Sequence, residues 1–417
     1  MKILVVGSGG REHTIVHALS KSPGATQLYC APGNGGIAGL ARCVPIKATD
    51  IPAMVDFALQ EKIDLVVVAP DDPLALGMVD ALEAAGVRAF GPRANAAIIE
   101  SSKAFAKNLM KKYSIPTAQY EIFSDYDAAL AYIHSKGAPI VVKADGLALG
   151  KGVVVAQTVE EAEEALRSMM MDKSFGESGS TVVIEEFMTG PEVTVLCFTD
   201  GKTIKPMLSS QDHKRAYDND RGPNTGGMGA FCPSPKFTPE IAAWCMDNIF
   251  RPTVEAMNAE GRPFKGVLYF GLMLTPQDPR VVEYNARFGD PETQPILSML
   301  ETDLLEIFEA VIDEKLADID IKWKPGAACC VVLASGGYPV KYQTGYEISG
   351  LADVPDDIIV YHAGTKLENG KYYTSGGRVL GVTAVAEDLP GAVARAYAGV
   401  GRISFTDMHY RKDIGAK

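Results

Sequence analysis

The sequence predicts a protein of mixed α/β and α+β class, with an N-terminal parallel sheet, a small α+β lid and a strand-rich C-terminal region. Apolar strand-like runs alternate with helix-like stretches over about the first hundred residues. Shorter strands and helices alternate over about 124–187, and roughly the last ninety residues are rich in strands and Gly-Gly turns. Continuous Val and Ile runs separated by helices are typical of a parallel sheet that is covered on both faces.

The N-terminal elements follow from apolar runs and turn residues. Residues 2–6 are an apolar strand that leads into a Gly-rich turn and a helix ending near Ser20. Residues 64–69 (DLVVVA) are a second buried strand, followed by a helix over about 73–85. We expect a domain boundary near 91–102.

The middle of the chain is predicted to hold a compact set of alternating elements. Ser102 caps a helix that runs to about residue 113, and Ser124 caps a helix over 125–136. Asp200-Gly201 is a hairpin signal. Strands are expected at 139–144, 153–156 and 181–187, and a helix at 159–171.

Composition excludes several classes of partner. The chain of 417 residues is 47% hydrophobic and 22% charged, with a net charge of −12 and no basic run, which argues against a nucleic-acid surface. No apolar run approaches the roughly 20 residues that cross a bilayer. The number of cysteines, seven, is odd and they form no CxxC motif, so we expect free buried thiols in a reducing cytoplasm.

The first candidate motif is GSGG at 7–10, a Gly-rich turn between a strand and a helix. Backbone N–H groups at such a helix N-terminus suit a phosphate. A dinucleotide fingerprint requires a third glycine, but Glu12 stands at that position. An ordinary tight turn remains the alternative for this segment. Residues 32–36 (PGNGG) are a second Gly-rich turn.

The second candidate is the Gly-rich loop KADGLALGKG at 143–152. Its glycines allow the backbone to approach phosphate oxygens, and Lys143 and Lys151 add positive charge. The loop lacks the GxxxxGK[ST] pattern of a Walker A motif. A hairpin with solvated lysines is the alternative. A third segment, 183–192, ends a buried strand in Glu185 and Glu186, where the backbone suits an adenine edge, although an exposed strand end is the better explanation of this segment taken alone.

The fourth candidate is VVEYNARFGDPETQ at 281–294. Strand alternation places Glu283 and Asn285 on one face, and two oxygen-bearing side chains so spaced suit Mg²⁺. Arg287 continues that face if the strand persists, and it suits a carboxylate or phosphoryl group. Asp290 followed by Pro291 also fits the N-cap and first residue of a helix.

The fifth candidate combines SQDHKR at 210–215 with GPNTGGMG at 222–229, and its polar density beside a Gly-rich loop suggests a substrate pocket. His213 within it is expected to be structural rather than catalytic.

Together these segments resemble the ATP-grasp superfamily and, within it, the phosphoribosylamine–glycine ligase family. The resemblance covers nearly the whole chain. Two departures are Asp71, where a Glu is expected, and Ser8, where Asn is common. The matching segments are GGREH at 9–13, PGNGG at 32–36, KADGLALGKGV at 143–153, SQDHKR at 210–215, GPNTGGMGA at 222–230, RFGDPETQ at 287–294, HAGT at 362–365 and SGGRVLGVTA at 375–384.

The resemblance implies a Rossmann-like domain at 1–101, an ATP-grasp domain at 102–325 with a mobile lid at about 120–190, and a C-terminal domain at 326–417. It implies ATP as co-substrate, with contacts from Lys103, Lys143, Gly146, Gly150, Lys151, Gly152, Glu185, Glu186, Phe187, Met188 and Glu192. It implies Mg²⁺ or Mn²⁺ at Glu283 and Asn285. Catalytic positions would be Arg287, Asp212 and Asp290. Substrate contacts would be Gly9, Gly10, Arg11, Asp71, Asp212, Lys214, Asn224, Thr225, Gly226, Arg287 and Asp290.

The implied reaction joins glycine to phosphoribosylamine at the expense of ATP, through glycyl phosphate, in purine biosynthesis. The partners are then small molecules, without nucleic acid or membrane, and we expect a cytoplasmic monomer, with a weak dimer as the alternative. Three other functions stay open: a carboxylate–amine ligase with another substrate, an NAD-dependent oxidoreductase built on the GSGG turn, and a catalytically silent nucleotide-binding protein.

Overall fold

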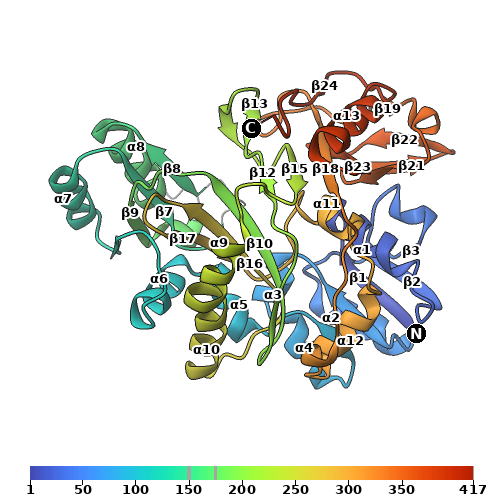
Figure 1. The fold of residues 1–417 in the computed structure, drawn as a ribbon, viewed down its shortest axis with the longest axis horizontal. Helices are drawn as coiled ribbons and strands as arrows, with labels where there is room; N and C mark the ends of the chain where they lie inside the picture. Colours follow the sequence, from blue (N-terminus) through green and yellow to red (C-terminus); the bar gives the residue numbers. More distant parts are fainter. Residues whose placement is uncertain (148–151, 173–175, 417) are drawn as a thin grey trace.

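The computed structural model describes residues 1–147, 152–172 and 176–416. Its N-terminal part, in blue in Figure 1, is a parallel sheet with strand order β3-β2-β1-β4-β5. In register, Val5 lies between Cys30 and Val67, so the apolar runs sit side by side. The strands are β1 (Lys2–Gly7), β2 (Gln27–Pro32), β3 (Arg42–Cys43), β4 (Leu65–Val68) and β5 (Arg88–Phe90).

Helices α1 (Gly10–Leu19) and α2 (Ile51–Gln60) lie between strands of this sheet in the chain. The single helix predicted over 73–85 is wrong. Two helices stand there, α3 (Asp71–Ala75) and α4 (Met78–Ala84), separated at Gly77. Gly77 has φ +88°, a left-handed conformation that interrupts a helix and that glycine adopts readily.

Two consecutive helices connect this sheet to the rest of the chain: α5 (Ala94–Ser101) and α6 (Lys103–Lys112). The predicted cap at Ser102 is confirmed, since its Oγ accepts the Phe105 N–H at 3.0 Å.

A small antiparallel sheet with its own apolar core follows, in the order β6-β9-β7-β8. Helices α7 (Tyr126–Lys136) and α8 (Val159–Met170) pack together against it, at the left of Figure 1. The cap predicted at Ser124 is off by one residue, because Asp125 accepts the Ala128 N–H at 2.8 Å. The strands are β6 (Tyr120–Phe123), β7 (Ile140–Ala144), β8 (Val153–Ala156) and β9 (Val182–Glu186).

A central antiparallel sheet, β11-β10-β16-β17, lies beside it. Its strands are β10 (Glu192–Asp200), β11 (Ile204–Pro206), β16 (Lys265–Leu274) and β17 (Pro279–Asn285), and the hairpin predicted at Asp200-Gly201 joins the first two. Two helical segments, α9 (Pro239–Cys245) and α10 (Arg251–Ala259), are joined by a π-helical turn at Met246–Phe250.

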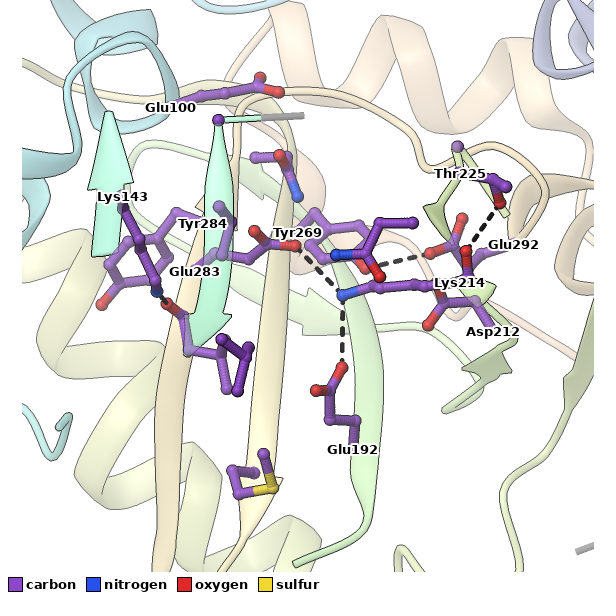
Figure 2. Close-up of a pocket in the computed structure, with 18 of the residues that line it drawn as sticks. Glu100, Lys143, Glu192, Asp212, Lys214, Thr225, Tyr269, Glu283, Tyr284 and Glu292 are labelled. Atoms are coloured by element: carbon purple, nitrogen blue, oxygen red, sulfur yellow. Dashed lines mark hydrogen bonds and ion pairs between the residues drawn. The ribbon is translucent and has the colours of Figure 1, made fainter. Parts of the chain in front are cut away.

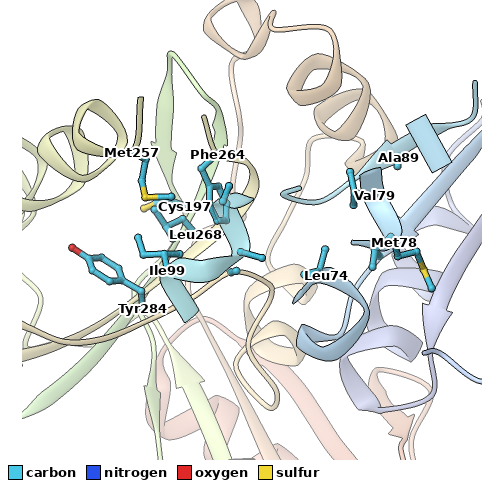
Figure 3. Packing of buried hydrophobic residues seen from close by; sticks show 14 of the residues in the cluster. Leu74, Met78, Val79, Ala89, Ile99, Cys197, Met257, Phe264, Leu268 and Tyr284 are labelled. Carbon is cyan, nitrogen blue, oxygen red and sulfur yellow. The ribbon is translucent and has the colours of Figure 1, made fainter. Parts of the chain in front are cut away.

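Alternating residues of the central sheet pack into two different cores. Cys197 and Leu268 join a cluster that holds Met257 of α10 and continues into the N-terminal part at Leu74 and Met78 (Figure 3). The opposite face packs with α12 (Leu304–Ile312), and α12 also contributes a ring that stacks on β5. This shared packing fixes the N-terminal sheet against the central one.

The C-terminal sheet takes strands from both sides of residue 325. β12 (Gln211–Asp212) and β15 (Gly229–Cys232) continue into β18 (Ala327–Ser335), β23 (Arg378–Ala386) and β20 (Ile358–His362), and β24 (Met408–His409) also pairs with β18. A boundary drawn at 325 therefore separates strands that are hydrogen-bonded neighbours.

The remaining elements are two helices that pack near the C-terminal sheet and two smaller sheets. α13 (Leu389–Val400) packs on β18 and β23, and α11 (Thr293–Ser298) leads from the central sheet toward them. Two smaller sheets are formed by β13 (Arg215–Tyr217) with β14 (Arg221–Asn224), and by β19 (Glu347–Ile348), β22 (Lys371–Thr374) and β21 (Thr365–Glu368). Within the described ranges, no helix combines the length and apolar character that spanning a bilayer requires.

Candidate active site

A cavity of about 900 Å³ is lined by residues of the small sheet, the central sheet, helices α5 and α6, and the C-terminal sheet. Most of the residues predicted to form the site meet there. Gly9, Gly10 and Gly146 do not line it, and Gly150 and Lys151 lie outside the described residues. The predicted residues that line it are Arg11, Asp71, Lys103, Lys143, Gly152, Glu185, Glu186, Phe187, Met188, Glu192, Asp212, Lys214, Asn224, Thr225, Gly226, Glu283, Asn285, Arg287 and Asp290.

The end of β17 presents Glu283 and Asn285 to the cavity. Glu283 Oε1 lies 3.5 Å from Lys214 Nζ. Burial acts to raise the pKa of Glu283, but the positive charges of Lys214 and other nearby cations outweigh it and hold the pKa below its ordinary value. An ionised carboxylate beside an amide oxygen is the donor set that Mg²⁺ or Mn²⁺ takes, so these two residues fit a divalent ion.

Arg287 reaches the same region although the strand does not continue to it, since β17 ends at Asn285. Its position is set by an ion pair instead: the Arg287 Nη2 lies 2.9 Å from Glu100 Oε1. The same nitrogen donates to Asn285 Oδ1 at 3.3 Å. Glu100 thus acts as a partner that sequence periodicity did not reveal.

Asp290 does not cap a helix, so the interpretation of Asp290 and Pro291 as an N-cap and first helical residue is wrong. α11 begins at Thr293 with Glu292 as its N-cap, because Asp290 is engaged elsewhere. Its carboxylate accepts the Arg11 N–H at 3.2 Å and lies 3.5 Å from Arg378. Burial opposes ionisation, but the two arginines outweigh it and lower the pKa of Asp290.

On the wall of the cavity formed by β7, β9 and α6, a buried carboxylate lies between two lysines. Glu185 Oε1 is 2.9 Å from Lys143 Nζ, and Glu185 Oε2 is 3.2 Å from Lys107 Nζ. Lys103 Nζ donates to the Gly146 carbonyl at 2.9 Å. The strand β9 then exits at Glu186, so the backbone that follows lies at the cavity edge beside these cations.

Lys214 lies between carboxylates in the centre of the cavity, as Figure 2 shows. Its Nζ is 3.3 Å from Glu192 Oε2 and 3.5 Å from Glu283 Oε1. Asp212 and Glu292 are drawn beside the same lysine. Burial raises the pKa of Asp212 to about 7 against the lowering by Lys214, with the nearby negative charges acting in the same direction as burial.

The GSGG turn is closed by carboxylates rather than open to a phosphate. The Gly9 N–H donates to Glu12 Oε2 at 2.5 Å, and a Cβ atom at Gly7 would lie 2.5 Å from Glu12 Cγ. The residue that replaces the third glycine of a dinucleotide fingerprint therefore fills the turn itself. This geometry disfavours the NAD-dependent oxidoreductase.

His213, predicted to be structural, lines the cavity, and its Nδ1 has no hydrogen-bond partner among the described residues. It is buried, its ring lies 6.0 Å from that of Phe231, and burial lowers its pKa to about 4, so it is neutral at physiological pH.

The cavity residues that received no role from the sequence include Glu100, Lys107, Tyr269, Glu292 and Arg378. Glu292 and Arg378 lie within matched segments, which was the available signal. Tyr269 donates to Glu292 Oε1 at 3.0 Å. Glu100 and Lys107 lie outside every motif, because their roles come from partners distant in the chain.

A small antiparallel sheet beside a second antiparallel sheet, with lysines and a carboxylate–amide pair lining the cavity between them, is the arrangement of an ATP-grasp protein. Models of the phosphoribosylglycinamide synthetase family match the N domain at 1–100, the ATP-grasp (A) domain at 101–293 and the C domain at 328–417. The chain belongs to this family, that of the phosphoribosylamine–glycine ligases.

Individual relatives agree with this placement. The phosphoribosylamine–glycine ligase of Caldanaerobacter subterraneus is 48% identical over 416 residues and 100% of both chains. That of Escherichia coli is 49% identical over 420 residues, covering 100% of this chain and 98% of the relative. The crystal structure of the Thermotoga maritima enzyme has a TM-score of 0.85 at 32% identity, covering 99% of this chain and 100% of that one. A biotin carboxylase from Campylobacter jejuni shares the fold, with a TM-score of 0.76 at 14% identity, covering 98% of this chain and 92% of that one.

Proposed function

We propose that this protein joins glycine to phosphoribosylamine, forming glycinamide ribonucleotide with conversion of ATP to ADP and phosphate, in purine biosynthesis. The observation that carries the proposal is the end of β17, where Glu283 and Asn285 face a cavity that Lys103 and Lys143 also line, with Lys143 Nζ donating to the Val282 carbonyl at 3.2 Å. Family membership over the whole chain supports the choice of substrates. It favours this reaction over a ligase with another substrate and over a silent nucleotide-binding protein.

The nucleotide would lie between the small sheet and the central sheet. Lys103, Lys143 and Gly152 would contact its phosphates, together with the loop that holds Gly146, Gly150 and Lys151. The backbone of residues 185–188 would hold the adenine, and Glu192 the ribose. Glu283 and Asn285 would hold Mg²⁺ or Mn²⁺, which neutralises phosphate charge when bound.

The two other substrates would occupy the part of the cavity nearer the C-terminal sheet. Arg287, Asp212 and Asp290 would lie at the reacting groups. Arg11, Asp71, Lys214, Asn224, Thr225 and Gly226 would complete the substrate contacts. Gly9 and Gly10, expected to join them, precede Arg11 in the same turn but do not line the cavity.

The chemistry requires activation because a free carboxylate is a poor electrophile. Transfer of the terminal phosphoryl group of ATP to glycine gives glycyl phosphate, whose phosphate is a good leaving group. The amine of phosphoribosylamine then attacks the acyl carbon, phosphate departs and an amide forms. Arg287 and the lysines would stabilise the phosphoryl charge, and closure of the small sheet over the cavity would keep water from the acyl phosphate.

The protein would act as a monomer in the cytoplasm. Its seven cysteines are all free and six are buried, and free thiols fit a reducing compartment, where disulfides rarely form.

The direct test mixes the protein with Mg²⁺, ATP, glycine and freshly prepared phosphoribosylamine and measures ADP and glycinamide ribonucleotide. ADP release should require both substrates. Glu283→Ala should retain the fold, checked by circular dichroism, but lose at least about 100-fold in kcat, since it removes a charged ligand at the developing phosphoryl charge. Undiminished turnover of this variant would contradict the metal-binding role.

A further inference from the structure

Glu100, at the end of α5, is buried beside the cavity and uses both carboxylate oxygens. Its Oε2 accepts the Ala286 N–H at 2.7 Å, and its Oε1 lies 2.9 Å from Arg287 Nη2. Ala286 is the residue between the proposed metal ligand Asn285 and Arg287. The carboxylate therefore fixes both the backbone and the side chain at the point where β17 ends.

Arg287 is held through both of its terminal nitrogens, whereas its Nε is buried and, among the described residues, unpaired. Its Nη1 donates to the Phe288 carbonyl at 3.3 Å, while its Nε has no hydrogen-bond partner within the part of the chain that the structure describes. The side chain is buried except for 19% of its surface, and it lines the cavity. A buried guanidinium with an unpaired N–H at a cavity is a donor for a ligand anion.

Stability alone is a weak reason for such a pair. A buried ion pair is often no more stabilising than apolar residues of the same volume, because both charges lose their hydration. Burial raises the pKa of Glu100, and Arg287 opposes that rise. What the pair supplies instead is a fixed orientation for a flexible arginine.

We propose that Glu100 is a positioning residue, which acts through Arg287 and the Ala286 peptide to aim the guanidinium at the carboxylate of glycine and at the acyl phosphate formed from it. The proposal rests on the proposed ligase function. Glu100 itself does not take part in bond making.

Glu100→Gln is the informative change. A glutamine amide has one acceptor oxygen, and its NH₂ group would face one of two donors, the Ala286 N–H or Arg287. One contact is lost, so kcat/KM for glycine should fall by about 10- to 100-fold, while KM for ATP should change less than about twofold. Glu100→Asp keeps the charge and should recover part of the loss.

Asp200→Asn is the matched control. Asp200 is a buried carboxylate that accepts the N–H groups of Lys202, Thr203 and Leu316, and it does not line the active-site cavity. This variant should have a lower melting temperature than the unmodified protein, but KM for glycine and KM for ATP should change by similar factors.

A double-mutant cycle with Arg287→Lys tests whether Glu100 acts through Arg287. The double variant should lose clearly less than the product of the two single losses, because both changes break the same Glu100–Arg287 contact and only the Ala286 contact is affected by Glu100→Gln alone. Where turnover is too slow, glycine binding is measured by calorimetry with a non-hydrolysable ATP analogue. Should Glu100→Gln not fold, Glu100→Asp replaces it in the cycle.

The outcomes are distinct. Losses that multiply in the double variant, or equal effects on glycine and ATP as in Asp200→Asn, would overturn the positioning role. Absence of product from the unmodified protein would instead overturn the proposed function.

Discussion

Acidification should loosen the contact between the N-terminal and C-terminal sheets through a cluster of buried histidines. His13 on α1 accepts the backbone N–H of His362 through Nδ1 at 2.7 Å, and the two rings lie 5.6 Å apart. His17 lies against Tyr361 in the same cluster. Burial, followed by the charges of His362 and His17, lowers the pKa of His13 to about 3. Burial lowers the pKa of His362 to about 4.

The sign and size of the effect follow from linkage. In the unfolded chain, each histidine binds a proton with an ordinary pKa near 6.5. In the folded protein, His13 binds its proton only when the pH approaches its lowered pKa of about 3. Stability is therefore full above pH 6.5 and falls as the pH drops toward 3. At pH 5 the pH lies about 1.5 units below the unfolded-state pKa of His13. Protonation of His13 in the unfolded chain therefore lowers the unfolding free energy by about 2 kcal/mol at this pH.

His13→Asn isolates this contribution, because the amide oxygen stands where Nδ1 stood and does not titrate. Urea unfolding is measured at pH 7 and pH 5 for the unmodified protein and the variant. The difference in unfolding free energy between the two pH values should be smaller by about 2 kcal/mol in the variant. His134→Asn, at an exposed ion pair with Glu163, is the control. An unchanged difference in His13→Asn would refute the reasoning.

Three further variants test separate parts of the structure. Lys107→Met leaves Glu185 buried with one cation fewer, so we expect a loss of about 3 kcal/mol in unfolding free energy and a raised KM for ATP. Unaltered urea unfolding would contradict this expectation. Arg378→Ala removes a donor to the Asp290 carbonyl at 2.6 Å and to the carbonyl of Gly226 in the neighbouring Gly-rich turn. Measured by steady-state kinetics, KM for phosphoribosylamine should rise about tenfold, more than KM for ATP. Ser102→Ala removes the cap of α6 and should cost about 1 kcal/mol in thermal unfolding, a cost that an unshifted melting curve would disprove.

Local signals predicted much of the fold. The strands predicted at 139–144 and 153–156 are β7 and β8, the hairpin at Asp200-Gly201 is present, and Ser102 caps its helix. In each case the deciding interactions lie within a few residues in the chain, where periodicity and capping rules apply. The errors were local too: a left-handed glycine split one predicted helix, and Asp125 rather than Ser124 capped another.

Site residues could be predicted where they belong to a sequence motif, but not where their positions depend on partners that are distant in the chain. Strand alternation predicted that Glu283 and Asn285 share one face, and both line the cavity. It extended that face to Arg287 only if the strand persisted, but the strand ends at Asn285 and the position of Arg287 depends on Glu100. The hydrogen bond that fixes this region joins residues 186 positions apart. Asp290 fitted a helix start by its sequence, yet arginines from two other parts of the chain engage it. No single-sequence pattern contains such pairings.

The strand β15 has a consequence for dividing this protein into pieces. Its residues Gly229–Cys232 pair with Ala328–Val331 of β18, although nearly a hundred residues of chain intervene. A fragment expressed from residue 326 onward would expose that edge of β18, and an open apolar edge recruits other chains. Gene fusions, truncations or split reporters designed at this point would have to supply the missing strand, because the sheet formed by residues 326–417 is completed by a strand from the middle of the chain.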